Sequence, residues 1–125
     1  MFAAEELSDD AFLGGLLRLW QPRQGYRAST DPVLLAACCG ARAGETVLDL
    51  GCGIGTAALC LGWRVPGVIL SGVEIQPAYA DLAARNAARA GLSMQVATGD
   101  VLNIPHALRL NYDHVITNPP YYRPS

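Results

Sequence analysis

The segment from Val47 to Gly55, with the sequence VLDLGCGIG, constrains the fold more than any other part of the chain. It begins with a short apolar run over residues 47–50, β-branched at its start, which favours a buried strand. Glycines follow at positions 51, 53 and 55, and their missing Cβ atoms allow a ligand to approach the backbone closely. We expect a helix to begin near Thr56 and to point its free N–H groups at this turn. The pattern predicts a cofactor-binding turn between a strand and a helix.

The spacing of the glycines bears on which cofactor the turn would bind. Dinucleotide-binding turns favour G-x-G-x-x-G, whereas this chain has G-x-G-x-G followed by Thr56. Asp49, two positions before the first glycine, would repel a pyrophosphate but is able to receive an ammonium group. S-adenosylmethionine carries an ammonium and a sulfonium and has no phosphate. We therefore favour a methyl donor over a nicotinamide cofactor, with a glycine-rich turn that binds no ligand as the remaining alternative.

Composition limits the class of protein. With 125 residues, 51% hydrophobic and 16% charged, the chain is long enough for one core-forming domain and is unlike a disordered protein. A formal net charge of -2 gives no overall basic signature of nucleic-acid binding. The four cysteines form no C-x-x-C pair and no histidine stands at ligand spacing, so we expect no metal site. Because no apolar run reaches membrane-spanning length, we expect a cytoplasmic protein without membrane contact.

Residues 1–30 are expected to form a leader and a flap, and residues 31–125 the cofactor-binding core. The acidic first ten residues indicate a frayed leader. Leu16–Trp20 alternates weakly, like an edge strand, and the turn signal at Gln24–Gly25 predicts a hairpin with a second short strand at Tyr26–Arg27.

The core is expected to alternate helices and strands. A helix start is predicted at Ser29–Pro32, where capping side chains precede a proline in the first turn. The apolar face of this helix is expected to comprise Val33, Leu34, Ala37 and Cys38. Beyond the glycine-rich turn we expect helices over 56–61 and 77–90 and strands over 68–73, 94–98 and 112–117.

Acidic side chains follow two of these core strands. Glu74 ends the second strand, where a carboxylate can accept both ribose hydroxyls of an adenosine ligand. A solvated strand-end carboxylate is the alternative for Glu74. Asp100 ends the third strand at the same sheet edge and can accept from an adenine amino group, with an exposed turn aspartate as the alternative.

The tetrapeptide Asn118-Pro119-Pro120-Tyr121 follows the fourth core strand. The prolines fix φ, and Pro119 restricts Asn118 to an extended conformation, so the asparagine oxygen and nearby carbonyls can converge on one planar NH₂ group. Tyr121 offers an aromatic face on which a planar substrate can stack. Acceptors that bond both amine hydrogens favour attack by its nitrogen and stabilise the positive charge that develops there. An incidental Pro-Pro turn is the alternative.

These motifs, in this order, resemble the class I S-adenosylmethionine-dependent methyltransferases that modify exocyclic or amide nitrogens. The upstream segment from Leu19 to Arg27, LWQPRQGYR, together with the stretch TDPVLLA over 30–36, is similar to the bacterial tRNA(Val) adenine-N6 methyltransferases. The resemblance covers the chain from about residue 10 onward. It implies S-adenosyl-L-methionine as cofactor and adenine N6 in tRNA as the methyl acceptor.

The resemblance also implies roles for individual residues. The cofactor would be held along its methionine end by Asp49, Gly51, Cys52, Gly53 and Gly55, at its ribose by Glu74, and around its adenine by Ile75, Asp100 and Val101. An upstream group that closes over the methionine moiety would comprise Tyr26, Arg27 and Asp31. The acceptor amine would be held by Asn118, Pro119, Pro120 and Tyr121, and RNA would be contacted by Arg23 and Tyr122.

The implied architecture is an α/β Rossmann-like sheet with parallel core strands in the order three-two-one-four and helices on both faces. Family members are about twice as long, so we expect a truncated sheet whose fourth strand is an open edge suited to homodimerisation. Two alternatives to tRNA methylation stay open, namely methylation of a protein glutamine amide and a non-catalytic cofactor-binding fragment. A nicotinamide oxidoreductase ranks behind them.

Overall fold

The computed structural model describes residues 1–24 and 30–117, and its strands form a small hairpin and a four-stranded sheet. The hairpin pairs β1 and β2 antiparallel, and the sheet is parallel with the order β5-β4-β3-β6. The strands are β1 (Leu7–Phe12), β2 (Leu17–Pro22), β3 (Thr46–Leu50), β4 (Ile69–Glu74), β5 (Met94–Thr98) and β6 (His114–Thr117). The α-helices are α1 (Thr30–Cys38), α2 (Thr56–Arg64) and α3 (Pro77–Ala90).

The predicted sheet order is confirmed, because the first to fourth core strands are β3, β4, β5 and β6. The bounds of α3 and β5 match the prediction residue for residue. Helix α2 runs three residues further than expected, through Gly62. A Cβ at Gly62 would lie 2.8 Å from Leu70 Cδ1 of β4, so the glycine allows the helix to pack closely on the sheet. None of the helices within the described ranges is long and apolar enough to cross a bilayer.

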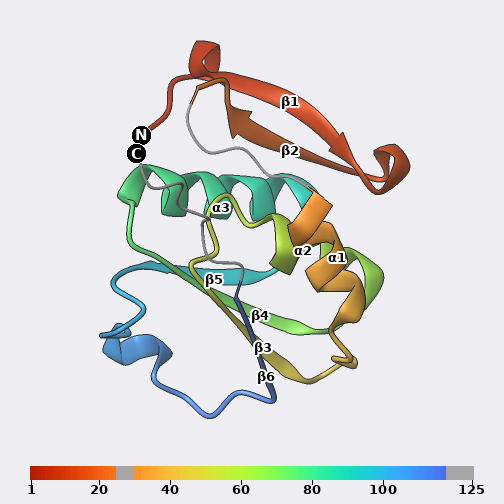
Figure 1. Cartoon of the computed structure of the whole chain (residues 1–125), viewed down its shortest axis with the longest axis vertical. Helices are drawn as coiled ribbons and strands as arrows, with labels where there is room; N and C mark the ends of the chain where they lie inside the picture. The colour runs from red at the N-terminus through yellow and green to blue at the C-terminus, as the bar shows by residue number, and fades with distance from the viewer. Residues whose placement is uncertain (25–29, 118–125) are drawn as a thin grey trace, which may run out of the picture.

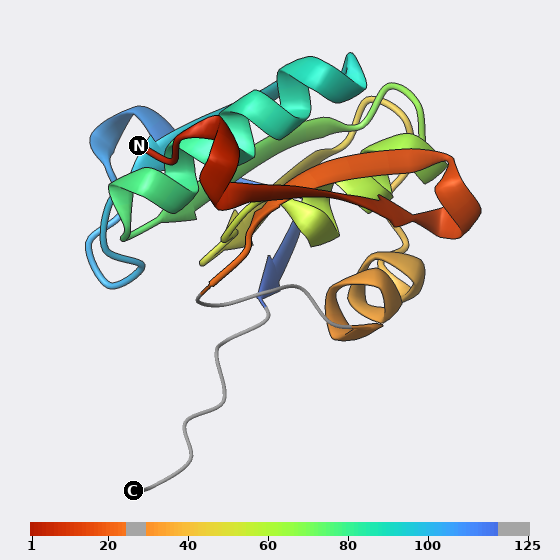
Figure 2. The ribbon, with the colours of Figure 1, turned by 90° about the horizontal axis from the view of Figure 1, so that it is seen from above.

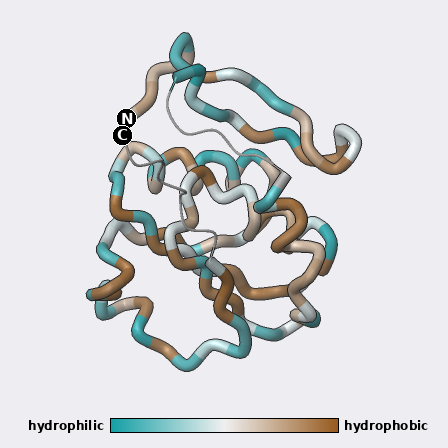
Figure 3. Tube along the Cα trace, viewed as in Figure 1, coloured by the Kyte–Doolittle hydropathy of each residue, from teal (hydrophilic) through white to brown (hydrophobic). Residues whose placement is uncertain are grey.

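The three α-helices lie on one face of the sheet, where α2 and α3 contact its strands and α1 packs on α2, which differs from the expectation of helices on both faces. Figure 2 shows α1 and α3 on either side of α2, and the main core joins side chains of α2 and α3 with Val47, Leu70 and Ile116 of the strands. Figure 3 shows hydrophobic residues concentrated along the central strands and the helices that contact them.

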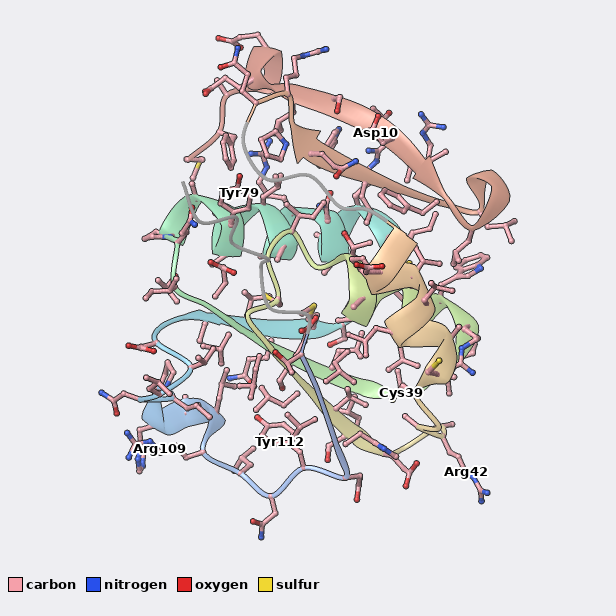
Figure 4. The ribbon with its side chains drawn as sticks, in the orientation of Figure 1. Asp10, Cys39, Arg42, Tyr79, Arg109 and Tyr112 are labelled. Atoms are coloured by element: carbon pink, nitrogen blue, oxygen red, sulfur yellow. The ribbon has the colours of Figure 1, made fainter. Side chains whose placement is uncertain are left out.

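The second face of the sheet is covered by the segment that connects β5 to β6. This segment contains a single 3-10 turn, η3 (His106–Leu108), preceded by Pro105, and no α-helix. Leu108 is buried against Leu48 and Val73 of the sheet, and Tyr112, which Figure 4 shows below β3, donates its hydroxyl to the Leu108 carbonyl at 3.0 Å. The cover is thinner here because the connection lacks a helix.

The prediction of a frayed acidic leader is wrong, since its residues form part of β1. A hairpin is present, and in it β2 pairs with the preceding β1 in the register Asp9↔Trp20, whereas the predicted second strand at Tyr26–Arg27 lies outside the described residues. Asp9 is compensated by two guanidinium groups, which lower its pKa: Arg89 of α3 at 2.9 Å and Arg18 of β2 at 3.1 Å. Figure 1 shows the hairpin on the outer side of α3.

A stack of aromatic and cationic groups fastens the hairpin to α3. The Trp20 ring faces two arginines of the helix, with the Cζ atoms of Arg89 and Arg85 at 4.5 Å and 5.5 Å from its centroid. Arg85 also donates to the carbonyl of Phe2 at 3.0 Å. The Phe2 ring packs in a T-shaped arrangement with the ring of Tyr79, labelled near the first turn of α3 in Figure 4. The N-terminal segment is therefore an integral layer of the fold.

The predicted apolar face of α1 is wrong for Leu34, Ala37 and Cys38, whereas Val33 packs against the core as expected. Pro32 and Ala36 are buried, whereas Ala37 and Cys38 are exposed and Leu34 is 59% exposed. The helix packs mainly against α2, so this neighbour, rather than the apolar pattern of α1 itself, selects the buried side.

Candidate cofactor site

The glycine-rich turn joins the end of β3 to α2, and two of its glycines face open space. The amides of Gly51 and Cys52 donate to the Val73 carbonyl of β4 at 2.8 and 3.0 Å, which anchors the turn to the neighbouring strand. Gly51 and Gly53 adopt φ values of 74° and 56°, and a Cβ built on either meets no described atom within 4 Å. The left-handed backbone and the clear space above it make a cradle that a side chain would fill.

Gly55, the third glycine, serves the packing of the helix. It is the N-cap residue of α2 with φ 94°, and a Cβ there would lie 3.2 Å from Leu59 Cδ1 and 3.5 Å from the Cβ of Ala83 in α3. The three glycines therefore have two different roles: the first two expose backbone, and the third allows α2 and α3 to meet beneath the turn.

Glu74 lies at the end of β4 and is held by backbone amides of two segments. One carboxylate oxygen accepts from the Gly53 N–H at 3.1 Å and the other from the Gln76 N–H at 2.9 Å, and the residue is only 9% exposed. These two bonds fix the orientation of the carboxylate beside the glycine-rich turn. The sequence predicted the position of Glu74 at the end of this strand. It did not predict that the backbone amide of Gln76 orients the carboxylate, because a backbone donor does not depend on residue type.

Asp49 is a buried carboxylate one strand away. It is 2% exposed, and it accepts a hydrogen bond from the backbone N–H of Ala58 in the first turn of α2. Because Gly55 has no side chain to cap the helix, this strand residue supplies the acceptor instead. Burial, together with the nearby Glu74 charge, raises the pKa of Asp49 to about 7 against a smaller opposing effect of the Ala58 N–H. Its predicted contact with an ammonium group stays a prediction.

Thr56 is a site residue that the sequence pattern did not identify, and its hydroxyl is the group of interest. Thr56 is the first residue of α2 and is 3% exposed, and its Oγ1 has no hydrogen-bond partner within the described part of the chain. A buried hydroxyl without a partner costs free energy that a bound ligand can recover. Its place directly after the third glycine was the available signal.

The residues expected around the adenine lie at the same edge of the sheet. The Gly99 amide donates to the Glu74 carbonyl at 3.0 Å, which brings the end of β5 beside the end of β4. Ile75 is 61% exposed and Val101 is 42% exposed, so both offer apolar surface to a ligand. Asp100 uses one carboxylate oxygen to accept from the Leu102 amide at 2.9 Å, which stabilises its own turn.

Cys52 contributes to the site through its backbone. Its side chain is buried over Gly72 of β4, where an added Cβ would lie 2.9 Å from the sulfur and 2.6 Å from Met94 Cε. Burial raises the pKa of the Cys52 thiol well above its usual value, and the Asp49 and Glu74 charges add to this effect. The thiol is therefore protonated and is no nucleophile.

The remaining predicted residues are dispersed or lie outside the described ranges. Asp31 is exposed in the first turn of α1. Arg23 borders a hollow of about 280 Å³ at the open end of the hairpin, lined also by Glu5 and Glu6, whose charges oppose phosphate binding there. No group of three or more potential metal ligands occurs within residues 1–24 and 30–117. Outside the described residues lie Tyr26, Arg27, Asn118, Pro119, Pro120, Tyr121 and Tyr122.

A parallel sheet whose central strand runs into a glycine cradle, with a clasped carboxylate at the end of the next strand, defines the Rossmann-like methyltransferase class. Two comparisons with solved structures agree. A tRNA (uracil-54, C5)-methyltransferase from Pyrococcus abyssi, in complex with S-adenosyl-L-homocysteine, superposes with a TM-score of 0.71 at 19% identity, covering 92% of this chain and 28% of that one. TrmN from Thermus thermophilus gives a TM-score of 0.63 at 27% identity, covering 71% of this chain and 27% of that one.

Residues 29–125 match the methyltransferase small domain family, and the chain belongs to this family. A curated relative, the tRNA1(Val) (adenine(37)-N6)-methyltransferase of Yersinia enterocolitica, is 35% identical over 106 residues, which cover 82% of this chain. The same alignment covers 42% of the relative, so the chain spans less than half the length of that protein.

Proposed function

We propose that this chain is the cofactor-binding part of an S-adenosylmethionine-dependent methyltransferase that acts on N6 of adenine in tRNA. The observation that carries the proposal is the clasped Glu74 beside the open backbone of Gly51 and Gly53. Membership of the methyltransferase small domain family and the tRNA-modifying activity named for the Yersinia relative support it. A tRNA substrate is also consistent with a cytoplasmic location, which we propose with it.

The residues present fit S-adenosylmethionine. Glu74 would accept from the ribose hydroxyls, Ile75 and Val101 would contact the adenine, and the open turn would receive the methionine end beside Asp49 and Thr56. When bound, the cofactor supplies an electrophilic methyl group on a sulfonium. The chain contributes orientation, because the carboxylate of Glu74 is already fixed by two backbone amides before any ligand arrives.

The acceptor motif is proposed for the same sheet edge. β6 pairs with β3 in the register Leu50↔Thr117, and Thr117 Oγ1 donates to the Leu50 carbonyl at 3.1 Å. In the sequence, Gly51 follows Leu50 and Asn118 follows Thr117. This supports a role for Asn118 as the acceptor of the amine hydrogens, which would orient the nitrogen lone pair, and for Tyr121 as the stacking surface for a base splayed out of the RNA.

Two measurements test the proposal. Isothermal titration with S-adenosylhomocysteine should show binding, and titration with NADH should not. Methyl transfer from radiolabelled S-adenosylmethionine should then label bulk tRNA rather than a glutamine-containing protein substrate, and Asn118→Ala should abolish the label while S-adenosylhomocysteine still binds. Binding without transfer to either acceptor would favour the non-catalytic alternative, and binding of NADH alone would overturn the proposal.

A second proposal concerns the edge of the sheet. Among the described residues β6 pairs only with β3, and Val115 on this strand is 56% exposed. We propose that two copies associate through this edge, because an unpaired strand offers backbone donors and acceptors to another chain. Light scattering over a concentration series should show a dimer, and a monomer at high concentration would refute this.

A further inference from the structure

Asn86 is a fully buried amide in the middle of α3 whose side chain makes hydrogen bonds with backbone groups of two other described segments. Its Oδ1 accepts from the Trp20 N–H at 2.8 Å, and its Nδ2 donates to the Trp20 carbonyl at 3.1 Å. The same Nδ2 donates to the Ile54 carbonyl at 3.0 Å. One side chain therefore joins β2 of the hairpin to the glycine-rich turn, two segments that are 34 residues apart in the sequence.

The bond to Ile54 acts on the part of the turn that the proposed site depends on. Ile54 is buried and lies between Gly53, whose N–H donates to Glu74, and Gly55, the N-cap residue of α2. Ala83, three residues before Asn86 on α3, lies beneath Gly55. Helix α3 thus supports the turn at two points on one face, and Asn86 fixes the direction of the Ile54 carbonyl.

The hairpin also contributes Leu17 and Leu19 to the apolar core shared with α3, but its other polar contacts with α3 lie nearer the surface. Asp9, the partner of Arg89, has a side chain that is 44% exposed, and Trp20 is half-buried in its stack with the arginines. Without Asn86, the N–H and carbonyl of Trp20 and the carbonyl of Ile54 would lose their partner, and buried groups without partners are costly. Asn86 is consequently a buried polar link through which the hairpin and the turn support one another.

We infer that Asn86 is a positioning residue that couples docking of the hairpin to the cofactor-binding conformation of the glycine-rich turn. The inference rests on the proposed cofactor site. Because coupling between two events is reciprocal, a docked hairpin strengthens cofactor binding, and a bound cofactor strengthens hairpin docking by the same factor. The hairpin, expected from the sequence to be a loose flap, then contributes to affinity for the ligand.

The first test uses the wild-type chain. Amide hydrogen exchange of Trp20, followed by NMR, should slow on the order of tenfold when S-adenosylhomocysteine saturates the protein. The Thr46 amide, which is bonded to Asp113 at the opposite end of the sheet, serves as the control and should slow less. Equal slowing of both amides, or no change at Trp20, would overturn the inference.

The second test uses Asn86→Asp, which keeps the acceptor for the Trp20 N–H and replaces the donor to both carbonyls. The dissociation constant for S-adenosylhomocysteine should rise on the order of tenfold, measured where circular dichroism shows the variant folded. Leu61→Ala, a core truncation near the other end of α2, is the matched control that loses stability and keeps its affinity. Unchanged affinity in Asn86→Asp would refute the coupling alone. Failure of the wild-type chain to bind would refute the proposed function as well.

Discussion

At its amino end, β3 is tied to β6 by side chains, whereas at its carboxyl end it opens into a glycine cradle flanked by buried carboxylates. Asp113 accepts from both the backbone N–H and the hydroxyl of Thr46, at 2.8 and 3.2 Å, and Glu45 contacts His114 at 3.1 Å. These polar groups are exposed or half-exposed, and they satisfy each other. At the other end Asp49 and Glu74 are buried, and their acceptors are aimed at backbone amides around an open turn.

The comparison shows that the fold accepts the free-energy cost of buried carboxylates at the carboxyl end of β3 and not at its amino end. Placing two carboxylates out of water on neighbouring strands raises the pKa of Asp49, which a purely structural strand end would avoid. The amino end shows that the same strand can be closed with exposed groups alone. The predictions that follow treat the carboxyl end as the functional end and the amino end as the structural one.

The largest expected effect is the pH dependence of stability from Asp49. Its pKa is about 7 in the folded chain, against an ordinary value of 3.8 in the unfolded chain, so between these two values the folded state holds a proton that the unfolded state has lost. The free energy of unfolding should therefore fall by about 4 kcal/mol as pH rises from 4 to 7 and then level off. Urea titrations across this range should show the fall in the wild-type chain and a flatter profile in Asp49→Asn. Parallel profiles would contradict the assignment.

The second largest effect is expected for the substitution Glu74→Gln, which should weaken ligand binding. The substituted amide presents an NH₂ group to one of the two backbone N–H donors, so the clasp at Gly53 and Gln76 cannot form fully. Affinity for S-adenosylhomocysteine should fall on the order of 100-fold, measured by calorimetry. Glu45→Gln, at the opposite end of β3, is the matched control and should bind as the wild type does. Equal losses in the two variants would remove the distinction between the ends.

Asp113→Ala should have a smaller effect, and it should lower stability rather than affinity. It removes the two hydrogen bonds with Thr46, so the free energy of unfolding should fall by about 1–2 kcal/mol. Affinity for S-adenosylhomocysteine should remain at the wild-type value because the site lies at the other end of the sheet. A large loss of affinity would show that the amino end also supports the site.

The smallest effect is expected for His114→Gln. The Arg42 backbone N–H and then His114 lower the pKa of the exposed Glu45 carboxyl, so the stabilisation from this group is present above its pKa and disappears as the pH falls through it. In an NMR titration the Glu45 midpoint should move upward in His114→Gln and stay below its usual value, because the Arg42 amide remains. A downward shift would be inconsistent with the contact.

The elements that the sequence predicted well are those whose signals are local. Pro77 and Gly91 bracket α3 with a start and a stop, and the glycines at 51, 53 and 55 mark the end of β3. The position of Glu74 at a strand end followed from the same local pattern. Parallel sheet order came from the resemblance rather than from residue patterns, because partners of parallel strands are distant in sequence.

The features that the sequence did not predict depend on distant partners. Asp9 disfavours a strand by its own propensity, and it is compensated in β1 by Arg18 of β2 and by Arg89 on α3, 80 residues away. Leu34 is exposed because α2 covers a different side of α1. Asn86 looked like an ordinary polar residue of α3, since nothing near it in the sequence reveals a bond to Ile54.

Because Trp20 stacks on the two arginines, its intrinsic fluorescence also reports on the position of the hairpin. The sequence has two tryptophans, and the other, Trp63, is 44% exposed at the end of α2, so a charged quencher in solvent will reach it first. The fluorescence that survives quenching comes mainly from Trp20, whose indole lies between the hairpin and α3. The emission wavelength and intensity of Trp20 will change, without any added label, when the hairpin separates from the helix.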